Sequence, residues 1–311
     1  IKVMENQTKE YILVFTGLTD LPELQLPLFC MFLLIYLVTL TGNLLILLLI
    51  FTDSHLHTPM YFFLGTLACL DMSYSSVTVP RMLFDLLTES RSITYITCIA
   101  QIFFFIFFAT AEVCLLTVMS YDRYVAICYP LHYTSIVNKK LCVVLTSCVW
   151  IFGLFYSLVH TLCALRLTFC YTATIRGFFC ELYQLIQTSC SDSSINILLV
   201  YVLASLVSFL AFFTISISYV RVFRIILHNK SNKGRTKGFS TCTSHLTVII
   251  IFYTTFIFNY FQPKTNNATA GGLVSLTYSM FTPCLNPIIY SLRNNELKRA
   301  LRRTLRKTKL L

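Results

Sequence analysis

The sequence predicts an all-α protein in which seven helices cross a membrane and a short amphipathic helix follows them. Two observations predict this fold class: the amino-acid composition and the regular spacing of the charged residues. Hydrophobic residues make up 56% of the 311 residues and charged residues only 12%, whereas a soluble domain carries about 25% charged residues. Such a composition is typical of a membrane protein.

The charged residues are separated by stretches long enough to span a bilayer. Asp, Glu, Lys and Arg are absent from 24–52, 92–111, 141–165, 193–220, 238–263 and 265–292, and the stretch 54–80 contains only Asp71. Each stretch reaches the roughly 20 residues that a helix needs to cross the bilayer, and the third continues past Glu112 to about Tyr124. Because helices satisfy their backbone groups internally, we expect seven membrane-spanning helices rather than core helices of a soluble protein.

The positions of Lys and Arg orient the chain. Most of the 24 basic residues lie on the side of the membrane that holds the C-terminus, and basic residues favour the cytoplasm. We therefore predict a multi-pass plasma-membrane protein with an extracellular segment at 1–23, a transmembrane domain at 24–292 and a cytoplasmic amphipathic helix and tail at 293–311. The net charge of +11 indicates attraction to the anionic lipid bilayer, not to nucleic acid.

The predicted outer side carries cysteines and glycosylation sequons. Two disulfides are expected there because oxidised pairs persist in that compartment, and four cysteines allow three pairings; the residues are Cys98, Cys170, Cys180 and Cys190. Asn6-Gln7-Thr8 and Asn267-Ala268-Thr269 are sequons on the same side, so Asn6 and Asn267 are candidate glycosylation sites.

Polar residues interrupt the spans at similar depths, at Asn43, Asp71, Glu112 and Asn286. Burying such groups costs several kcal/mol unless they find partners, so we expect one interior polar cluster. Asp71 and Glu112 would share a cation such as Na⁺, or one of them would stay protonated. The alternative is a hydrogen-bonded network that only holds the helices together. No other cofactor is expected.

Motifs mark the predicted inner ends of the third and seventh spans. Asp122 and Arg123 can pair with each other, and Arg123 would be released when helices shift; the alternative is a static anchor at the interface. In "LNPIIY", Pro287 removes an intrahelical hydrogen bond and predicts a kink beside the polar cluster. Beyond this motif, leucines repeat every four residues among basic residues, which predicts a basic amphipathic helix on the inner leaflet.

Longer strings narrow the class further. Seven spans with "SYDRY" ending the third and "NPIIY" ending the seventh resemble a rhodopsin-like (class A) G-protein-coupled receptor. The strings "LHTPMYFFL" (56–64), "MSYDRYVAICYPLHY" (119–133), "SY" (218–219), "KGFSTCTSH" (237–245) and "PCLNPIIYSLRN" (283–294) resemble the vertebrate olfactory receptors. The match covers about residues 10 to 306 in the expected order.

The resemblance implies specific roles. Cys98 would bond Cys180, and Cys170 would bond Cys190. Release of Arg123 would admit the C-terminal helix of a G-protein α-subunit, and the partner would be a stimulatory heterotrimeric G protein of the olfactory type that raises cyclic AMP. The acids Asp71 and Glu112 would hold sodium. The coupling residues would be Asp122, Arg123, Tyr124, Tyr219, Asn286, Pro287 and Tyr290.

The resemblance also implies an odorant pocket among the outer halves of spans three to seven. Mostly apolar walls with a few hydroxyl groups suit a small volatile of low polarity. Binding would come from apolar burial at about 25 cal/mol per Å², so weak and broad affinity is expected. Helical spacing from the motifs turns four residues of the third span inward: Phe105, Ile106, Ala109 and Thr110. The other lining residues that we expect on spans four to seven are His160, Leu203, Ala204, Val207, Tyr253, Phe256, Ile257, Tyr260 and Ser279.

Other classes of membrane protein are weaker interpretations. A transporter or channel usually shows repeated halves or several charges along a path, whereas the predicted spans four to seven contain no charged residue. An intramembrane enzyme would need Asp71 and Glu112 as catalytic carboxylates. We predict a receptor and not an enzyme. Gly177 stands at a common His position of the family, so metal-assisted odorant binding through that His is not expected.

Overall fold

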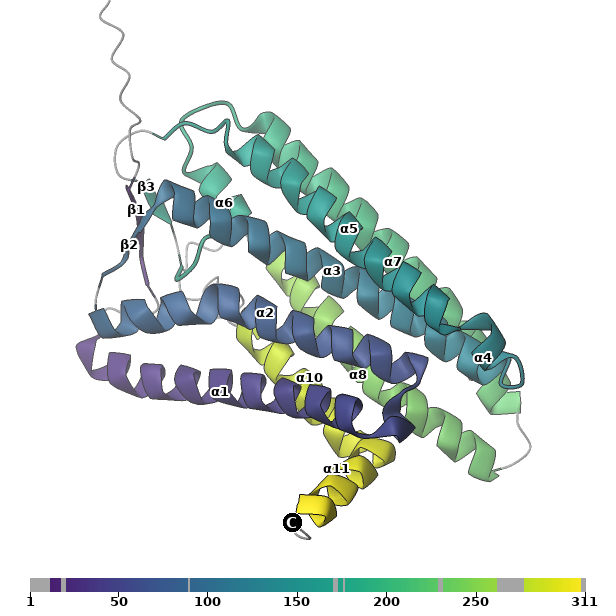
Figure 1. Ribbon diagram of the computed structural model, residues 1–311. Helices are drawn as coiled ribbons and strands as arrows, with labels where there is room; N and C mark the ends of the chain where they lie inside the picture. The colour runs from purple at the N-terminus through teal and green to yellow at the C-terminus, as the bar shows by residue number, and fades with distance from the viewer. Residues whose placement is uncertain are drawn as a thin grey trace, which may run out of the picture.

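The computed structural model describes residues 12–17, 21–88, 90–169, 173–175, 177–228, 232–261 and 277–308. These residues are mainly helical, and the long helices run side by side (Figure 1). Five helices are long and apolar enough to cross a membrane: α1 (Pro22–Thr52), α2 (Pro59–Thr88), α3 (Tyr95–Cys128), α5 (Lys139–Ala164) and α7 (Ser194–His228). They correspond to the first five predicted spans.

The predicted sixth and seventh spans are covered in part by the described residues. Helix α8 (Asn232–Phe261) occupies the sixth, and its apolar portion is Cys242–Thr255. The seventh is described only from the π-helical turn η2 (Thr277–Phe281), which leads into α10 (Thr282–Arg293). The remaining short helices are η1 (Ser54–Leu56), α4 (Tyr133–Ile136) and α6 (Leu182–Gln187), and α11 (Asn295–Thr308) ends the described chain.

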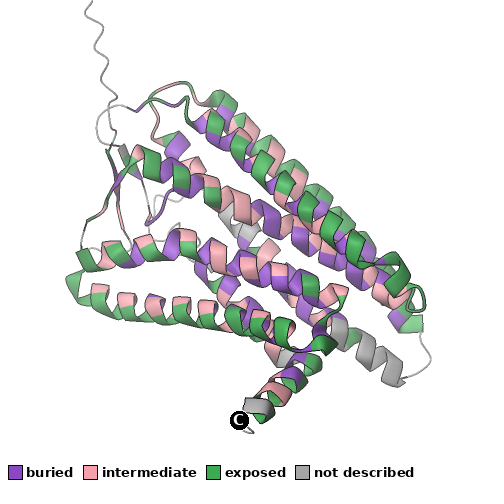
Figure 2. Ribbon diagram, viewed as in Figure 1, coloured by how far each residue is buried: buried purple, intermediate pink, exposed green. Residues whose placement is uncertain are grey.

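Helix α3 is central to the packing and packs against α2, α5 and α7, whereas α1 packs on α2 and α10. The outward faces of α1, α5 and α7 are largely exposed (Figure 2). On α7, Phe209 and Phe213 are 72% and 68% exposed, and a continuous apolar surface of this kind requires lipid or a partner to cover it. The exposure pattern therefore agrees with a bundle surrounded by hydrocarbon.

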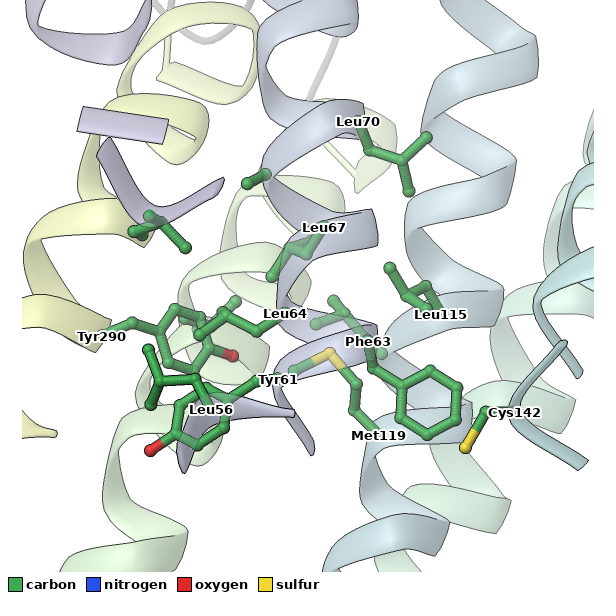
Figure 3. Packing of buried hydrophobic residues seen from close by; sticks show 14 of the residues in the cluster. Leu56, Tyr61, Phe63, Leu64, Leu67, Leu70, Leu115, Met119, Cys142 and Tyr290 are labelled. Carbon is green, nitrogen blue, oxygen red and sulfur yellow. The ribbon is translucent and has the colours of Figure 1, made fainter. Parts of the chain in front are cut away.

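One cluster of buried residues joins the halves of α2 and α3 that lie near α4 and α11 (Figure 3). It combines Leu64 and Leu67 of α2 with Leu115 and Met119 of α3, and Tyr290 of α10 belongs to the same cluster. Helices α1 and α10 also approach closely at Gly42 of α1, because a Cβ atom there would lie only 3.2 Å from the ring of Pro287. The motif of α10 that contains Pro287 is thus packed directly against α1.

The sequence predicted only helices, but a small three-stranded sheet lies at the end of the bundle opposite α11 (Figure 1). Strand β1 (Ile12–Phe15) lies between β2 (Ser92–Thr94), which is antiparallel to it, and β3 (Ala173–Ile175), which is parallel. Leu13 and Phe15 are fully buried while Ile12 is exposed, the alternation expected of a strand with one covered face. Residues 12–15 of the predicted extracellular segment are therefore paired with two interhelical loops.

The turn after β1 requires glycine. Gly17 has a φ of +77°, and a Cβ atom there would lie 3.0 Å from the guanidinium group of Arg91. The same guanidinium donates a 2.6 Å hydrogen bond to the carbonyl of Thr16. A side chain at position 17 would therefore strain the backbone and displace the arginine that holds this turn to the loop before β2.

At the other end, an ion pair joins α11 to the turn after α1. The carboxylate of Asp53 accepts hydrogen bonds from Arg303 Nε (2.7 Å) and from His55 Nδ1 (2.9 Å). Burial tends to raise the pKa of Asp53, but the hydrogen bonds from Arg303 and His55 outweigh it and lower the pKa to about 2. Leu297 and Ala300 of α11 are buried, so one face of the predicted amphipathic helix packs on the protein.

We expect the attachment of α11 to weaken as the pH falls. A carboxyl group whose pKa is lower in the folded state stabilises that state above its ordinary pKa, here 3.8, and this contribution is lost as the pH falls from about 4 toward 2. The change Asp53→Asn should remove this stabilising contribution at neutral pH, so that amide hydrogen exchange in α11 becomes faster by about tenfold. Hydrogen-exchange mass spectrometry on purified protein measures this rate.

Glu296→Gln is the matched control. Glu296 pairs with Arg299 at 2.7 Å on the exposed surface of the same helix, where an ion pair contributes little. Equal effects of Asp53→Asn and Glu296→Gln on the exchange of α11 would contradict the assigned role of Asp53.

Candidate functional site

A cavity of about 220 Å³ lies between α3, α5, α7 and α8. Part of its wall comes from the start of α6, where Leu182 and Tyr183 line it together with the preceding residue Glu181. Tyr74 of α2 and Thr282 of α10 also line the cavity. The cavity is on the same side of the bundle as the sheet, because α6 belongs to that end (Figure 1). Residues from most of the described long helices thus meet around one space.

Many of the predicted lining residues meet at this cavity. On α3, the predicted residues recur at intervals of three and four, which keeps their side chains on one helical face. On α5, the predicted His160 lines the cavity together with Tyr156, which lies one turn before it. The predicted residues that line the cavity are Phe105, Ile106, Ala109, Thr110, His160, Ala204 and Val207.

Several other predicted residues do not line it. Leu203 is half-buried elsewhere on α7, and the hydroxyl of Tyr253 donates a 3.3 Å hydrogen bond to the carbonyl of Ser208, which ties α8 to α7. Ile257 is 52% exposed. The rotation of α8 about its axis explains the exposure of Ile257. Thr255 lines the cavity, and a residue two positions further along a helix points about 200° away, on the opposite side. Ser279 is buried within η2, and the side chains of Phe256 and Tyr260 lie outside the described residues.

Sequence reasoning missed part of the wall. Some of these residues continue the predicted helical faces by one turn and could have been found from spacing, such as Val113 after Ala109 and Ser208 after Ala204. The residues from α6 and the preceding loop had no periodic signal. The missed residues are Tyr74, Val113, Tyr156, Glu181, Leu182, Tyr183, Val200, Tyr201, Ser208, Phe252, Thr255 and Thr282.

Two buried polar atoms at this cavity have no hydrogen-bond partner in the described part of the chain. One is Nε2 of His160, whose residue is 3% exposed and whose ring lies 4.6 Å, centroid to centroid, from that of Tyr156. The other is Oε1 of Glu112, whose residue is 4% exposed. An unpaired buried polar atom costs about 1–3 kcal/mol, so both atoms are suited to contact a bound molecule or ion.

Only two of the four residues in the predicted polar cluster, Asp71 and Asn286, are hydrogen-bonded to each other. Asn286 Nδ2 donates to both carboxylate oxygens of Asp71, at 2.9 and 3.1 Å. Asn43 instead donates to the carbonyls of Thr39 (3.0 Å) and Pro283 (3.3 Å), which links α1 to α10. Two buried acids fit a monovalent cation or a proton, although the described residues contain no group of three acidic, His or Cys side chains that could hold a metal ion.

Near the C-terminal end of α3, the predicted pair is formed and buried. Arg123 donates from its Nη2 and, at 3.1 Å, from its Nε to Asp122, while the hydroxyl of Tyr133 donates to the other carboxylate oxygen at 2.6 Å. Asp122 is 1% and Arg123 7% exposed, so the pair is not a residue snorkelling to the membrane surface. The carboxylate is shared between an arginine and a tyrosine.

Of the other predicted coupling residues, the three tyrosines lie near this pair, whereas Asn286 is bonded to Asp71 and Pro287 packs against Gly42. The hydroxyl of Tyr219 lies 2.6 Å from His245 Nδ1 in a buried contact, and Tyr124 packs in the same cluster as Tyr219. Tyr290 is buried, and its hydroxyl has no hydrogen-bond partner among the described residues. This end of the bundle therefore contains a buried tyrosine–histidine contact as well as a buried ion pair.

A disulfide fixes the loop that covers the cavity. Cys98 is bonded to Cys180, with the Cα atoms 5.5 Å apart, as the resemblance implies. The amide of Cys180 donates to Gln101 Oε1 (2.9 Å), and Gln101 Nε2 donates to the carbonyl of Val77 (2.9 Å). Cys190 is also disulfide-bonded; its predicted partner Cys170 and the sequon residues Asn6 and Asn267 lie outside the described residues.

Comparison with known proteins agrees with the motifs. A family model described as olfactory receptor matches residues 32–308. The chain is 45% identical to olfactory receptor 1E16 of Mus musculus, over 98% of each chain. It is 47% identical to olfactory receptor 1J21 of Mus musculus, over 98% of this chain and 97% of the relative. It is also 47% identical to olfactory receptor 1J1 of Homo sapiens, over 97% and 94% respectively.

We expect Gln101 to be required for the position of the covering loop. Gln101→Met keeps the length of the side chain but removes both hydrogen bonds, which leaves the buried amide of Cys180 without its acceptor and should cost about 2 kcal/mol. The thermal unfolding temperature of detergent-solubilised protein should fall. Gln187→Met, at an exposed position on α6, is the control, and similar unfolding temperatures for the two variants would refute the assignment.

Proposed function

The chain belongs to the olfactory receptor family, and on this premise we propose that it is an odorant receptor. A small, mostly apolar volatile binds in the cavity, and binding activates a stimulatory heterotrimeric G protein of the olfactory type that raises cyclic AMP. The family is one of receptors and not of enzymes, so the buried acids are interpreted as binding groups and not as catalysts.

The observation that carries this proposal is the course of α3. Its residues from Phe105 to Val113 contribute to the cavity wall, and Arg123 lies about ten residues, or 15 Å, further along the same helix. A rigid helix that contacts the ligand at one point and carries the buried ion pair at another is a direct physical connection between the two sites. Ligand binding that shifts or rotates α3 would therefore act on Arg123.

The ion pair supplies the second state that a switch needs. Removing an arginine from its acid leaves both charges uncompensated, which is costly in an apolar environment. Release of Arg123 from Asp122 therefore requires a new partner, which the C-terminal helix of the G-protein α-subunit would provide. Tyr133 would continue to donate to Asp122, and Tyr219 and Tyr290 would repack around the arginine, with Tyr124 at the rim.

We propose that the bundle has seven spans, with α8 and the chain through α10 as the last two, and that the N-terminus is extracellular in the plasma membrane. Two features support this orientation. The disulfides lie with the sheet at one end, and disulfides persist on the extracellular side. The basic helix α11 lies at the opposite end (Figure 1), where basic residues favour the cytoplasm.

We also propose that Asp71 and Glu112 hold a sodium ion. Oxygen ligands suit this cation, and the unpartnered Oε1 of Glu112 together with the carboxylate of Asp71 would supply them. In the same chain Asn286 is already bonded to Asp71, so the ion would connect α2, α3 and α10. The cation lowers the cost of two like charges in an apolar interior.

The sodium site predicts a specific salt effect. The thermal unfolding temperature of purified receptor should be higher in NaCl than in choline chloride of equal ionic strength, and Glu112→Gln should abolish the difference because it removes one of the two charges. If the unmodified receptor unfolds at the same temperature in both salts, the acid pair forms only a hydrogen-bonded network and the sodium site is rejected.

The receptor function is tested by odorant-dependent cyclic AMP in cells that express this chain with the olfactory-type G protein. We expect a panel of small volatiles to include compounds that raise cyclic AMP, and we expect Arg123→Ala to abolish the response at an unchanged amount of receptor on the cell surface. Surface labelling at the N-terminus measures that amount.

Lys298→Ala is the control for loss of a positive charge at the cytoplasmic end, because its side chain lies on the exposed side of α11. A response that survives Arg123→Ala, or ligand-dependent uptake or current in cells without the G protein, would contradict the proposed function.

A further inference from the structure

Strand β1 and the turn after it connect the N-terminal segment to the loop that covers the cavity. Building on the proposed function, we propose that residues 12–17 are a positioning element for odorant binding. They hold the covering loop in place, and the buried side chains of Leu13 and Phe15 determine how tightly the odorant is retained. Neither side chain is among the described residues that line the cavity, so both act through residues of its wall.

The sheet depends on β1 because β1 is its middle strand. In the strand order β2-β1-β3, the strands β2 and β3 each pair with β1 and not with one another. Strand β2 directly precedes α3, and β3 lies in the chain segment that leads to Cys180 and α6. Strand β1 is therefore the hydrogen-bonded link between the start of α3 and the loop whose next residues line the cavity.

Hydrogen bonds continue this link beyond the strand. The amide of Thr16 donates to the carbonyl of Ile175 at 3.0 Å. The amide of Gly17 donates to the carbonyl of Gly177 at 2.9 Å, and the amide of Gly177 donates to the Thr16 hydroxyl at 3.0 Å. Shortly after Gly177, the same loop reaches the cavity wall at Glu181. The N-terminal segment thus holds the covering loop close to the point at which it enters the wall.

The buried face of β1 packs behind that wall. Leu13 and Phe15 are 0% and 1% exposed and belong to one cluster of buried apolar residues. Three residues that line the cavity belong to this cluster or pack against it: Ile106 of α3, Leu182 of α6 and Val200 of α7. Because a closely packed interior transmits a change of volume to its neighbours, truncation of Phe15 loosens side chains that the odorant contacts.

The disulfide alone does not determine the direction of the covering loop. The bond to Cys98 and the hydrogen bond to Gln101 both act at Cys180, so they fix one point of the loop. The hydrogen bonds from Thr16 and Gly17 fix the loop at Ile175 and Gly177, which is a second point. Two points of attachment define the direction of a segment, whereas one leaves it free to turn.

Loosening the second attachment should weaken odorant binding more than it weakens coupling. The covering loop leads into Leu182 and Tyr183 of the wall, and an odorant against a displaced wall buries less apolar surface. A rise of about tenfold in the half-maximal concentration corresponds to about 55 Å² of lost apolar contact, at about 25 cal/mol per Å². Arg123 lies near the other end of α3, so the maximal response should change much less.

The first test measures cyclic AMP in cells that express the receptor and its G protein. Straight-chain alcohols, aldehydes, ketones and esters are screened, and the compound with the lowest half-maximal concentration serves as the probe. At equal amounts of receptor on the cell surface, Phe15→Ala should raise that concentration by about tenfold. Phe15→Leu should raise it less, because a smaller volume is removed.

Ile12→Ala is the matched control, because Ile12 lies on the opposite face of the same strand and is 53% exposed. It should leave the half-maximal concentration of the probe unchanged. If Phe15→Ala does not reach the membrane, Gly17→Ala replaces it, since the added Cβ atom would lie 3.0 Å from the guanidinium group of Arg91 and shift the turn without removing core volume. Equal half-maximal concentrations for this variant and for Ile12→Ala would overturn the inference.

The second test is a pair of double-mutant cycles. The effects of Phe15→Ala and Leu182→Ala on the half-maximal concentration should not add, because both side chains belong to the same packed region. The effects of Phe15→Ala and Val207→Ala should add, because Val207 lines the cavity on α7 outside this cluster of described residues. Additive effects in both cycles would show that Phe15 only stabilises the fold, and this would overturn the inference.

A third measurement needs no odorant. Amide hydrogen exchange of residues 177–187 in purified receptor should be faster in Phe15→Ala, or in Gly17→Ala, than in Ile12→Ala. Equal exchange rates would overturn the inference while leaving the receptor function intact. Absence of any cyclic AMP response of the unmodified receptor to the whole screen would instead reject the proposed function.

Discussion

The structure depends on one constraint: a polar group surrounded by apolar side chains or lipid must find a partner within the protein. The helices satisfy this constraint for the backbone. For side chains, it explains why Arg123 lies against Asp122, why Asp122 also accepts from Tyr133, and why Asn286 donates to Asp71. Two of these pairings join different helices, α3 to α4 through Tyr133 and α2 to α10 through Asn286, so the same requirement that stabilises the bundle also helps to determine which helices meet. Stability and specificity therefore have a common origin here.

Three exceptions to this constraint lie where function is expected. Glu112 and His160 retain buried atoms without partners in the described part of the chain, and both residues line the cavity. The buried hydroxyl of Tyr290 on α10 also has no hydrogen-bond partner among the described residues. A protein that pays for an unsatisfied polar atom in one state recovers the cost when a ligand, an ion or a second conformation supplies the partner. The binding of a ligand and the switching of the receptor therefore both depend on the free-energy cost of leaving a buried polar atom without a partner.

Helix α3 collects these features along its length. It begins at the disulfide to Cys180, continues along the cavity, passes Glu112 and ends beyond Arg123. Its neighbours α2, α5 and α7 pack around it, so a movement of α3 changes contacts at both ends of the bundle. At the end of the bundle opposite α11, the sheet of β1, β2 and β3 joins the N-terminal segment to the loops before α3 and before α6. The loop that lines the cavity is therefore part of the same framework.

The sequence by itself determined the membrane class, the approximate spans and the helical faces that supply Phe105, Ala109 and Ala204 to the cavity, because hydrophobic length and helical periodicity are local properties. It also located Asp122 beside Arg123. Only the tertiary structure decided that α8 turns Thr255 and not Ile257 toward the cavity, that Glu181 belongs to the wall and that Asp53 holds Arg303. These outcomes depend on helix rotation, loop paths and contacts between distant segments, and no local pattern in the chain encodes them.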